Sequence, residues 1–164
     1  MKTRTLRSVV YFASGLGLIV SLFAAAEYLD VALRGVCQIS SFFSCSAVDR
    51  SGLTTTLGVQ DYLWGIGGFI VIIALAALAE RRPNDRVRAY VLLAVTTAGV
   101  AVSLYFLYVE LGLIHALCIV CALAYLCGGV AWVGAIALVA RAEAARASGG
   151  EDDRDLAGAP EAEG

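Results

Sequence analysis

Apolar residues fall into four long blocks along the chain, and the polar and charged residues lie between these blocks or outside them. The blocks cover approximately residues 8–28, 63–79, 89–109 and 116–140. Each is close to the roughly 20 residues that an α-helix needs to cross a bilayer. The pattern therefore predicts an all-α membrane protein, built as a bundle of four transmembrane helices.

Composition strengthens this interpretation. Of the 164 residues, 60% are hydrophobic and 16% are charged, whereas soluble domains contain about 45–50% apolar and about 25% charged residues. A secretory signal peptide is the alternative for the first block, but that block is longer than the usual apolar core of about 7–15 residues. The net charge of −2 and the absence of a basic face give no indication of nucleic-acid binding.

The connections between the blocks differ in length. The loop 29–62 exceeds the roughly 12–15 residues above which loops are usually functional or disordered. It contains several apolar residues, namely Phe42, Phe43, Leu53, Leu57 and Tyr62. We expect it to cap the helix ends, with a short helix over residues 45–50 that ends at Gly52. The connections at 80–88 and 110–115 are short, and the Gly-, Ala- and acid-rich residues 148–164 are expected to form a disordered tail beyond a membrane domain of residues 1–147.

Positive charge is distributed unevenly between the two predicted membrane faces. Ten of the 12 Lys and Arg residues fall on one side, namely Lys2, Arg4, Arg7, Arg81, Arg82, Arg86, Arg88, Arg141, Arg146 and Arg154. The positive-inside rule therefore predicts a multi-pass plasma (inner) membrane protein with both termini in the cytoplasm. Four of the five cysteines then lie at the outer face, which is the oxidising side of a prokaryotic membrane.

Cys118 and Cys121 form a C-x-x-C motif where the fourth block begins. Residues three apart share a helix face, so the two sulfurs can approach each other. The positive end of the helix dipole stabilises a thiolate there, and the thiolate is the reactive species. A zinc site is a weaker alternative because such sites usually need two pairs of ligands. Two membrane cysteines at chance spacing remain a further alternative.

Cys37 and Cys45 form a second pair in the long outer loop. A loop pair and a helix pair at the same membrane face are what a relay by thiol–disulfide exchange requires. The loop pair can meet a soluble protein, while the helix pair can face a lipid-soluble molecule. A purely structural disulfide between Cys37 and Cys45 is the alternative.

Together these features resemble the vitamin K epoxide reductase family in its stand-alone prokaryotic form. The resemblance covers roughly residues 8–140. It rests on the separated cysteine pair, on Ser51, Gly58 and Trp64-Gly65 after it, and on the stretch from Leu117 through Cys118 and Cys121 to Tyr125. The order of the cysteines is the most specific element of this pattern.

The resemblance implies a role for each of these four cysteines. Cys37 would exchange with a thioredoxin-like protein outside the cytoplasm, and Cys45 would pass the electrons to Cys118. Cys121 would be the thiolate that meets a membrane quinone of the menaquinone, ubiquinone or vitamin K type. The expected function is a quinone-dependent thiol–disulfide oxidoreductase that supports disulfide bond formation, without flavin, haem or metal.

Three further residues are candidates for the quinone pocket. Tyr125 shares a helix face with Cys118 and Cys121, and its hydroxyl can donate a hydrogen bond to a quinone carbonyl; packing in an interfacial aromatic belt is the alternative. The resemblance implies that Ser51 supports the redox pocket, although a helix-ending serine beside Gly52 fits equally well. Asp61 stands where many family members carry an asparagine, and only a protonated Asp can donate a hydrogen bond.

Other polar residues and one cysteine are assigned ordinary roles. Cys127 is six positions past Cys121 and so faces elsewhere on the helix, where it is expected to pack as a small apolar residue. His115 is expected to be a solvated turn residue. Glu27, Asp30 and Glu110 are placed at outer helix ends in contact with water.

Two rival functions remain. A protein of the disulfide bond formation protein B type also has four spans, two cysteine pairs and a quinone, but its C-x-x-C belongs to the first outer loop. A non-catalytic membrane scaffold with a disulfide-stapled loop is the rival from another class. Reduction of a quinone by a dithiol donor separates the scaffold from both enzymes.

Overall fold

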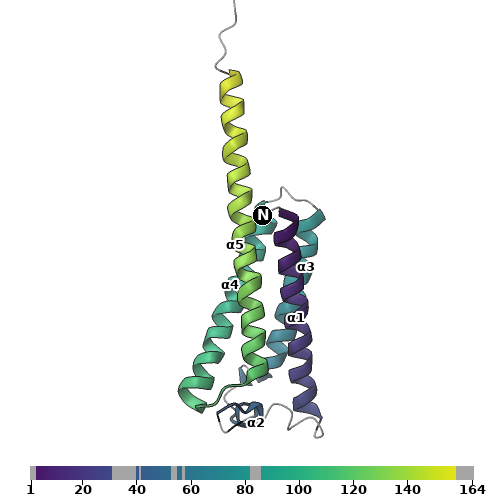
Figure 1. Ribbon diagram of the computed structural model, residues 1–164, viewed down its shortest axis with the longest axis vertical. Helices are drawn as coiled ribbons and strands as arrows, with labels where there is room; N and C mark the ends of the chain where they lie inside the picture. The colour runs from purple at the N-terminus through teal and green to yellow at the C-terminus, as the bar shows by residue number, and fades with distance from the viewer. Residues whose placement is uncertain are drawn as a thin grey trace, which may run out of the picture.

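The computed structural model describes residues 3–30, 40, 42–52, 55–56, 58–81 and 86–157. Four long helices form its bundle, namely α1 (Thr3–Leu29), α3 (Asp61–Arg81), α4 (Arg86–Tyr108) and α5 (Ile119–Ala157) (Figure 1). The smaller elements are α2 (Cys45–Arg50), β1 (Thr55–Thr56), β2 (Val59–Gln60) and the π-helix η1 (Val109–Ile114).

All four predicted spans are confirmed as helices that are long and apolar enough to cross a membrane. By length and composition these spans cover Arg4–Leu29, Asp61–Ala79, Arg86–Ile114 and Ile119–Ala147. The predicted short helix over residues 45–50 is also confirmed, since α2 covers Cys45–Arg50 and Gly52 follows it with φ +67°. That positive φ is a conformation that glycine adopts without steric strain.

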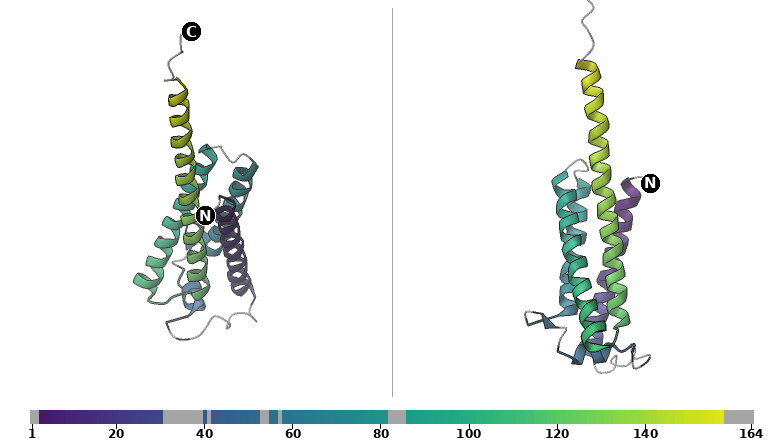
Figure 2. Two further views of the ribbon diagram at one scale, coloured as in Figure 1. Left: turned by 45° about the horizontal axis from the view of Figure 1, so that its top comes forward. Right: turned by 90° about the vertical axis from the view of Figure 1, so that its left-hand side faces the viewer.

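Neighbouring helices of the bundle pack in the order α1, α3, α4, α5, with α5 returning to α1 (Figures 1 and 2). The diagonal pair α3 and α5 makes only slight contact. Glycine permits three close approaches to α1, because a Cβ at Gly17 would overlap the ring of Phe69, one at Gly65 would overlap Ser21 and one at Gly134 would overlap Val10. Other glycines of the bundle have no described atom within 4 Å of such a Cβ, namely Gly15, Gly67, Gly68, Gly128 and Gly129.

A short antiparallel hairpin precedes α3. It pairs Thr55 with Gln60 and Thr56 with Val59, and Gly58 has φ +78° between the two strands. Strands of two residues are too short to produce an alternating pattern, so the sequence did not predict them. The hairpin leads directly into Asp61, the first residue of α3, and so helps to position this side chain.

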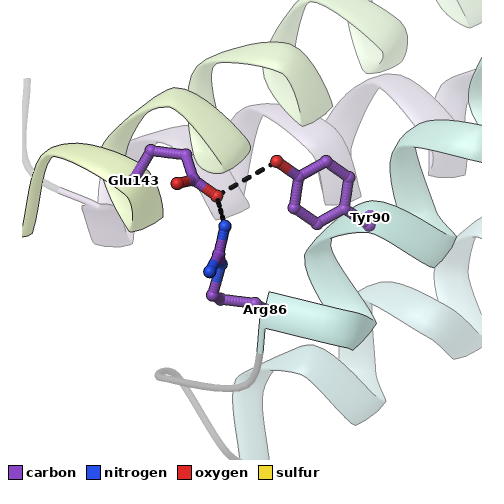
Figure 3. Close-up of polar contacts among 3 residues, drawn as sticks. All are labelled: Arg86, Tyr90 and Glu143. Atoms are coloured by element: carbon purple, nitrogen blue, oxygen red, sulfur yellow. Dashed lines mark hydrogen bonds and ion pairs between the residues drawn. The ribbon is translucent and has the colours of Figure 1, made fainter. Parts of the chain in front are cut away.

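At the end of the bundle opposite α2, side chains of α4 and α5 make polar contacts (Figure 3). Arg86 forms an ion pair with Glu143, and the Tyr90 hydroxyl donates a hydrogen bond of 3.0 Å to Glu143 Oε1. Ion pairs as exposed as this one contribute little to stability, because water screens the two charges. These contacts connect the beginning of α4 to the second half of α5.

Beyond the bundle, α5 continues as a helix to Ala157 and projects past the other helices (Figure 2). This differs from the disordered tail that we expected from Ser148 onward; residues 158–164 lie outside the described residues. Extending a helix that has already formed avoids the cost of nucleation, and Ala, Glu and Arg favour the helical state. Composition alone therefore underestimated how far the helix extends.

Candidate functional site

Cys118 lies immediately before α5 and caps its N-terminus. Its carbonyl accepts a hydrogen bond of 2.9 Å from the N–H of Ala122, and its Sγ accepts one of 3.2 Å from the N–H of Cys121. Side-chain acceptors, and above all anionic ones, are stabilised at this position by the free N–H groups of the first turn. The predicted helix start at residue 116 is therefore displaced to Ile119 because Cys118 is the cap.

Three sulfur atoms lie in a row at this cap. Cys118 Sγ is 3.2 Å from Cys45 Sγ and 2.6 Å from Cys121 Sγ, so Cys118 is the middle member. Cys45 is disulfide-bonded, whereas Cys118 and Cys121 are free thiols. Thiol–disulfide exchange proceeds by attack of one sulfur on another through a mixed disulfide. These distances allow exchange between the loop and the helix without a large movement of either.

The loop is attached to α5 by contacts on both sides of Cys45. Phe43 and Leu117 form a parallel β-bridge, and the N–H of Leu117 donates to the carbonyl of Phe42 at 2.8 Å. Within α2, Val48 is fully buried and belongs to an apolar cluster with Cys45, Ala116, Cys118 and Val120. The expectation that the loop after α1 caps the redox site is thus confirmed for its described part.

Cys121 also faces a cavity of about 620 Å³ inside the bundle. The cavity occupies the space between α3 and α5, the two helices that scarcely touch. Its lining is mainly apolar and includes Trp64, Phe69, Phe106, Cys121 and Tyr125. Pockets of about 300–1,000 Å³ with mainly apolar walls are typical of small-molecule sites. Gly67, Gly68 and Gly128 also line it, and a Cβ at these positions would meet no described atom within 4 Å, so these glycines leave open space.

Asp61 provides one of the polar groups beside this cavity. Its Oδ1 accepts a hydrogen bond of 2.7 Å from the N–H of Tyr62, which holds the carboxyl at the beginning of α3. Its Oδ2 lies 3.8 Å from Cys121 Sγ, with the thiol as donor. The structure therefore brings Asp61 and Cys121 together from distant parts of the sequence.

Glu110 is a site residue that sequence reasoning missed. Its side chain is fully buried, although we expected it at a helix end in contact with water. Its Oε1 accepts a hydrogen bond of 2.7 Å from the Tyr125 hydroxyl, and its Oε2 accepts one of 3.0 Å from the N–H of Cys118. One carboxyl thus joins the cap of α5 to the tyrosine of the cavity.

A signal for Glu110 was nevertheless present in the sequence. It follows the apolar residues Phe106 by four positions and Val109 by one, and residues four apart share a helix face. An ionisable residue within a membrane-spanning segment is a functional-site hypothesis by default. Because we ended the third span at Val109, we placed Glu110 outside the membrane.

The expected turn over residues 110–115 is instead the π-helix η1. The carbonyl of Glu110 accepts hydrogen bonds from the N–H groups of His115 and Ala116, and His115 ends the helix with φ 57°. Single π-helical turns within α-helices occur frequently at functional sites. Here the wide turn ends α4 while leaving the Glu110 side chain buried, and the chain then continues directly to Cys118.

Not every predicted residue lies at the cavity. Ser51 caps α2, since its hydroxyl donates to the carbonyl of Val48 at 2.7 Å, and it is not among the residues that line the cavity. Cys127 packs in the bundle core with residues such as Val10 and Ala135. His115 is exposed. Cys37 lies outside the described residues, so its position is not part of this geometry.

Metal binding has no support among the residues that the structure describes. No group of three or more His, Cys, Asp or Glu side chains there is arranged to hold a metal ion.

Four apolar helices around a row of cysteine sulfurs and a mainly apolar cavity define a membrane protein with a thiol redox site. The sequence model of the vitamin K epoxide reductase family matches residues 8–136. The chain belongs to this family, as its cysteine pattern led us to expect. It is therefore a multi-pass membrane thiol–disulfide oxidoreductase, of a family that in general uses quinone-type electron acceptors and thioredoxin-like partners. No curated protein matches the chain.

Proposed function

We propose that this protein carries electrons from a thioredoxin-like protein outside the cytoplasm to a quinone in the membrane, and thereby supports disulfide bond formation. The observation that carries the proposal is the continuous path of sulfur atoms. Cys45, Cys118 and Cys121 follow one another at 3.2 Å and 2.6 Å, and Cys121 alone of these three lines the cavity. The path connects a loop, which a soluble protein can reach, to an apolar site.

Each step of the proposed relay is balanced. The dithiol of the partner reduces a disulfide between Cys37 and Cys45 and is itself oxidised. The Cys45 thiolate then attacks Cys118 of a Cys118–Cys121 disulfide and releases the Cys121 thiolate, after which Cys37 attacks Cys45 and frees Cys118. Two electrons pass from Cys118 and Cys121 to the quinone, their disulfide forms again, and the quinone takes up two protons to become a hydroquinone.

The distances between the sulfur atoms allow exchange in either direction. In the reverse direction Cys118 would attack Cys45, and the same mixed disulfide would form. The relative reduction potentials of the two cysteine pairs and the quinone decide the direction. For a two-electron couple, a difference in potential of about 30 mV corresponds to about 1.4 kcal/mol.

The cavity supports a planar apolar acceptor of the menaquinone, ubiquinone or vitamin K type. Trp64, Phe69 and Phe106 contribute aromatic walls, and Tyr125 and Asp61 place oxygen atoms beside Cys121. In the proposed pose the quinone ring lies against the Cys121 sulfur, with its carbonyl oxygens toward these polar groups. Ser51 would act at a distance from the quinone, through the end of α2.

The proposal is tested by quinone reduction with the purified wild-type protein in detergent. A membrane-permeable dithiol should drive the reduction of at least one of these three quinones, followed by the change in quinone absorbance. Protein whose thiols have been alkylated under denaturing conditions is the control for uncatalysed reduction. If the native protein reduces none of the three quinones faster than this control, the non-catalytic scaffold becomes the better account.

We further propose that both termini are cytoplasmic and that the loop carrying Cys45 is outside. Ser40 is exposed and its N–H donates to the carbonyl of Phe43, just before α2. Ala147 is exposed and follows Glu143, which contacts the beginning of α4 at the opposite end of the bundle. With the five native cysteines replaced, a membrane-impermeant maleimide should therefore label a Ser40→Cys variant in intact cells but not an Ala147→Cys variant. Labelling with the opposite preference would reverse the orientation and place the relay in the cytoplasm.

A further inference from the structure

The hydrogen bond between Tyr125 and Glu110 has a consequence for quinone chemistry. A tyrosine hydroxyl carries a single proton, and in the structure that proton is directed at Glu110 Oε1 over 2.7 Å. While this bond exists, Tyr125 cannot also donate to a molecule in the cavity that it lines. Tyr125 becomes a donor to the cavity when Glu110 carries a proton of its own, because the protonated carboxyl then donates to the tyrosine oxygen and the tyrosine proton can turn toward the cavity.

Glu110 is well placed to undergo this change. Its side chain is fully buried, and within the described part of the chain no basic side chain forms an ion pair with it. The titratable groups that interact with it there are Tyr125, Cys121 and Asp61. An unpaired carboxylate in an apolar interior is costly, so such a group readily exists in its protonated form. Glu110 therefore has a reason to hold a proton beside the redox site.

Reduction of a quinone creates a demand for that proton. Two electrons and two protons convert a quinone to a hydroquinone, and the walls of the cavity are mainly apolar. A positioned side chain that transfers a proton in such a site contributes typically about 10²–10⁴-fold to the rate. Tyr125 lies at the cavity and Glu110 lies behind it, so the two groups form a path that ends at the acceptor.

We propose that Glu110 is a positioning residue that supplies, through Tyr125, one of the protons for quinone reduction. The inference rests on the proposed function and adds a residue to it. The carboxyl proton moves to the Tyr125 oxygen while the Tyr125 proton moves to one carbonyl oxygen of the quinone. Glu110 is left as a carboxylate and Tyr125 remains neutral.

The remaining protons and electrons are balanced at the cysteines. Cys118 and Cys121 give two electrons to the quinone and release two protons as their disulfide forms. One of these protons goes to the second quinone oxygen, and the other restores the Glu110 carboxyl. The net reaction consumes only the dithiol and the quinone. The hydrogen bond from the N–H of Cys118 to Glu110 Oε2 at 3.0 Å keeps the carboxyl next to the thiols that protonate it again.

The test compares Glu110→Gln with the wild-type protein in the dithiol-driven quinone assay. Glutamine can keep both contacts, since its carbonyl accepts from Cys118 and its amide donates to the Tyr125 oxygen, but it cannot release a proton. We expect kcat to fall about 10²-fold while KM for the quinone stays within about 3-fold. Glu110→Asp keeps an ionisable group and should retain more activity than Glu110→Gln.

Glu143→Gln is the matched control. Glu143 also accepts a hydrogen bond from a tyrosine, Tyr90, but at the opposite end of the bundle (Figure 3). This variant should turn over at the wild-type rate. Adding Glu110→Gln to Tyr125→Phe should lower kcat by less than about 3-fold beyond Tyr125→Phe alone, because both changes interrupt one path.

Three results would overturn the inference while leaving the proposed function intact. The first is an active wild-type protein with an equally active Glu110→Gln variant. The second is a double variant in which kcat falls by the product of the losses measured for Glu110→Gln and Tyr125→Phe alone. The third is a Glu110→Asp variant that is no more active than Glu110→Gln. A wild-type protein that reduces no quinone would instead overturn the proposed function itself.

Discussion

Replacing Cys121 with alanine is expected to abolish quinone reduction with every electron donor, by about 10³-fold or more. Cys121 is the only one of the three closely spaced cysteines that lines the cavity, so no other described sulfur can reach a quinone there. Cys118→Ala should be equally inactive, because Cys121 then has no partner with which to form a disulfide. The measurement is dithiol-driven quinone reduction in detergent.

The loop cysteines should behave differently. Cys37→Ala and Cys45→Ser should stop oxidation of a thioredoxin-like protein, because electrons can no longer enter through the loop. A small membrane-permeable dithiol can reduce Cys118–Cys121 directly, so quinone reduction with it should stay within about 3-fold of wild type. Cys127→Ala is the control, since Cys127 packs in the bundle core, and it should be active with both donors. Equal loss from all four substitutions with the small dithiol would contradict a relay.

A variant that keeps Cys45 and Cys118 but lacks Cys37 and Cys121 is expected to form a Cys45–Cys118 disulfide in most molecules under mild oxidation. The two Sγ atoms are 3.2 Å apart, and the β-bridge between Phe43 and Leu117 holds their backbones together. Without Cys37 and Cys121 neither of the cysteines that exchange with this pair is present to resolve the bond, and Cys127 packs in the bundle core. Free-thiol counting by maleimide mass labelling and mass spectrometry of the linked peptides would measure it.

The control for this crosslink is a variant whose only cysteines are Cys45 and Cys127. Cys127 follows Cys118 by nine residues on α5, which places it about 13 Å further along the helix axis at 1.5 Å per residue. A disulfide needs Cα atoms within about 7 Å, so this pair should stay reduced. Equal crosslinking of the two variants would show that the loop is not held at Cys118 and would remove the structural basis for the relay.

Much of the fold could be predicted from local patterns. Each span is a continuous apolar segment, and a helix is the structure that satisfies its own backbone within a membrane. The helix over residues 45–50 was predictable because Gly52 marks its end. The extent of the helices was less predictable: α4 continues as η1, and α5 continues to Ala157. A hydropathy pattern indicates where a membrane ends, whereas hydrogen bonds along the backbone decide where a helix ends.

The members of the candidate site were predictable to different degrees. Cysteine order and helix phase identified Cys118, Cys121 and Tyr125, because residues three to four apart on one helix share a face. Asp61 was found only through a family resemblance, and the structure places it 3.8 Å from Cys121. Glu110 was assigned to water because it follows the last apolar residue of a predicted span. Its burial depends on α5 and the capping loop, which no local window contains.

By itself the sequence determined the four membrane-spanning helices, the cysteine pairs and the membrane face on which they are predicted to lie. These features depend on composition, spacing and charge, which act locally along the chain. Only the tertiary structure decided that Cys118 is the middle sulfur, that a cavity lies between α3 and α5, and that Glu110 joins Cys118 to Tyr125. Each of these depends on which surfaces of distant segments pack together, and packing is a property of the whole bundle.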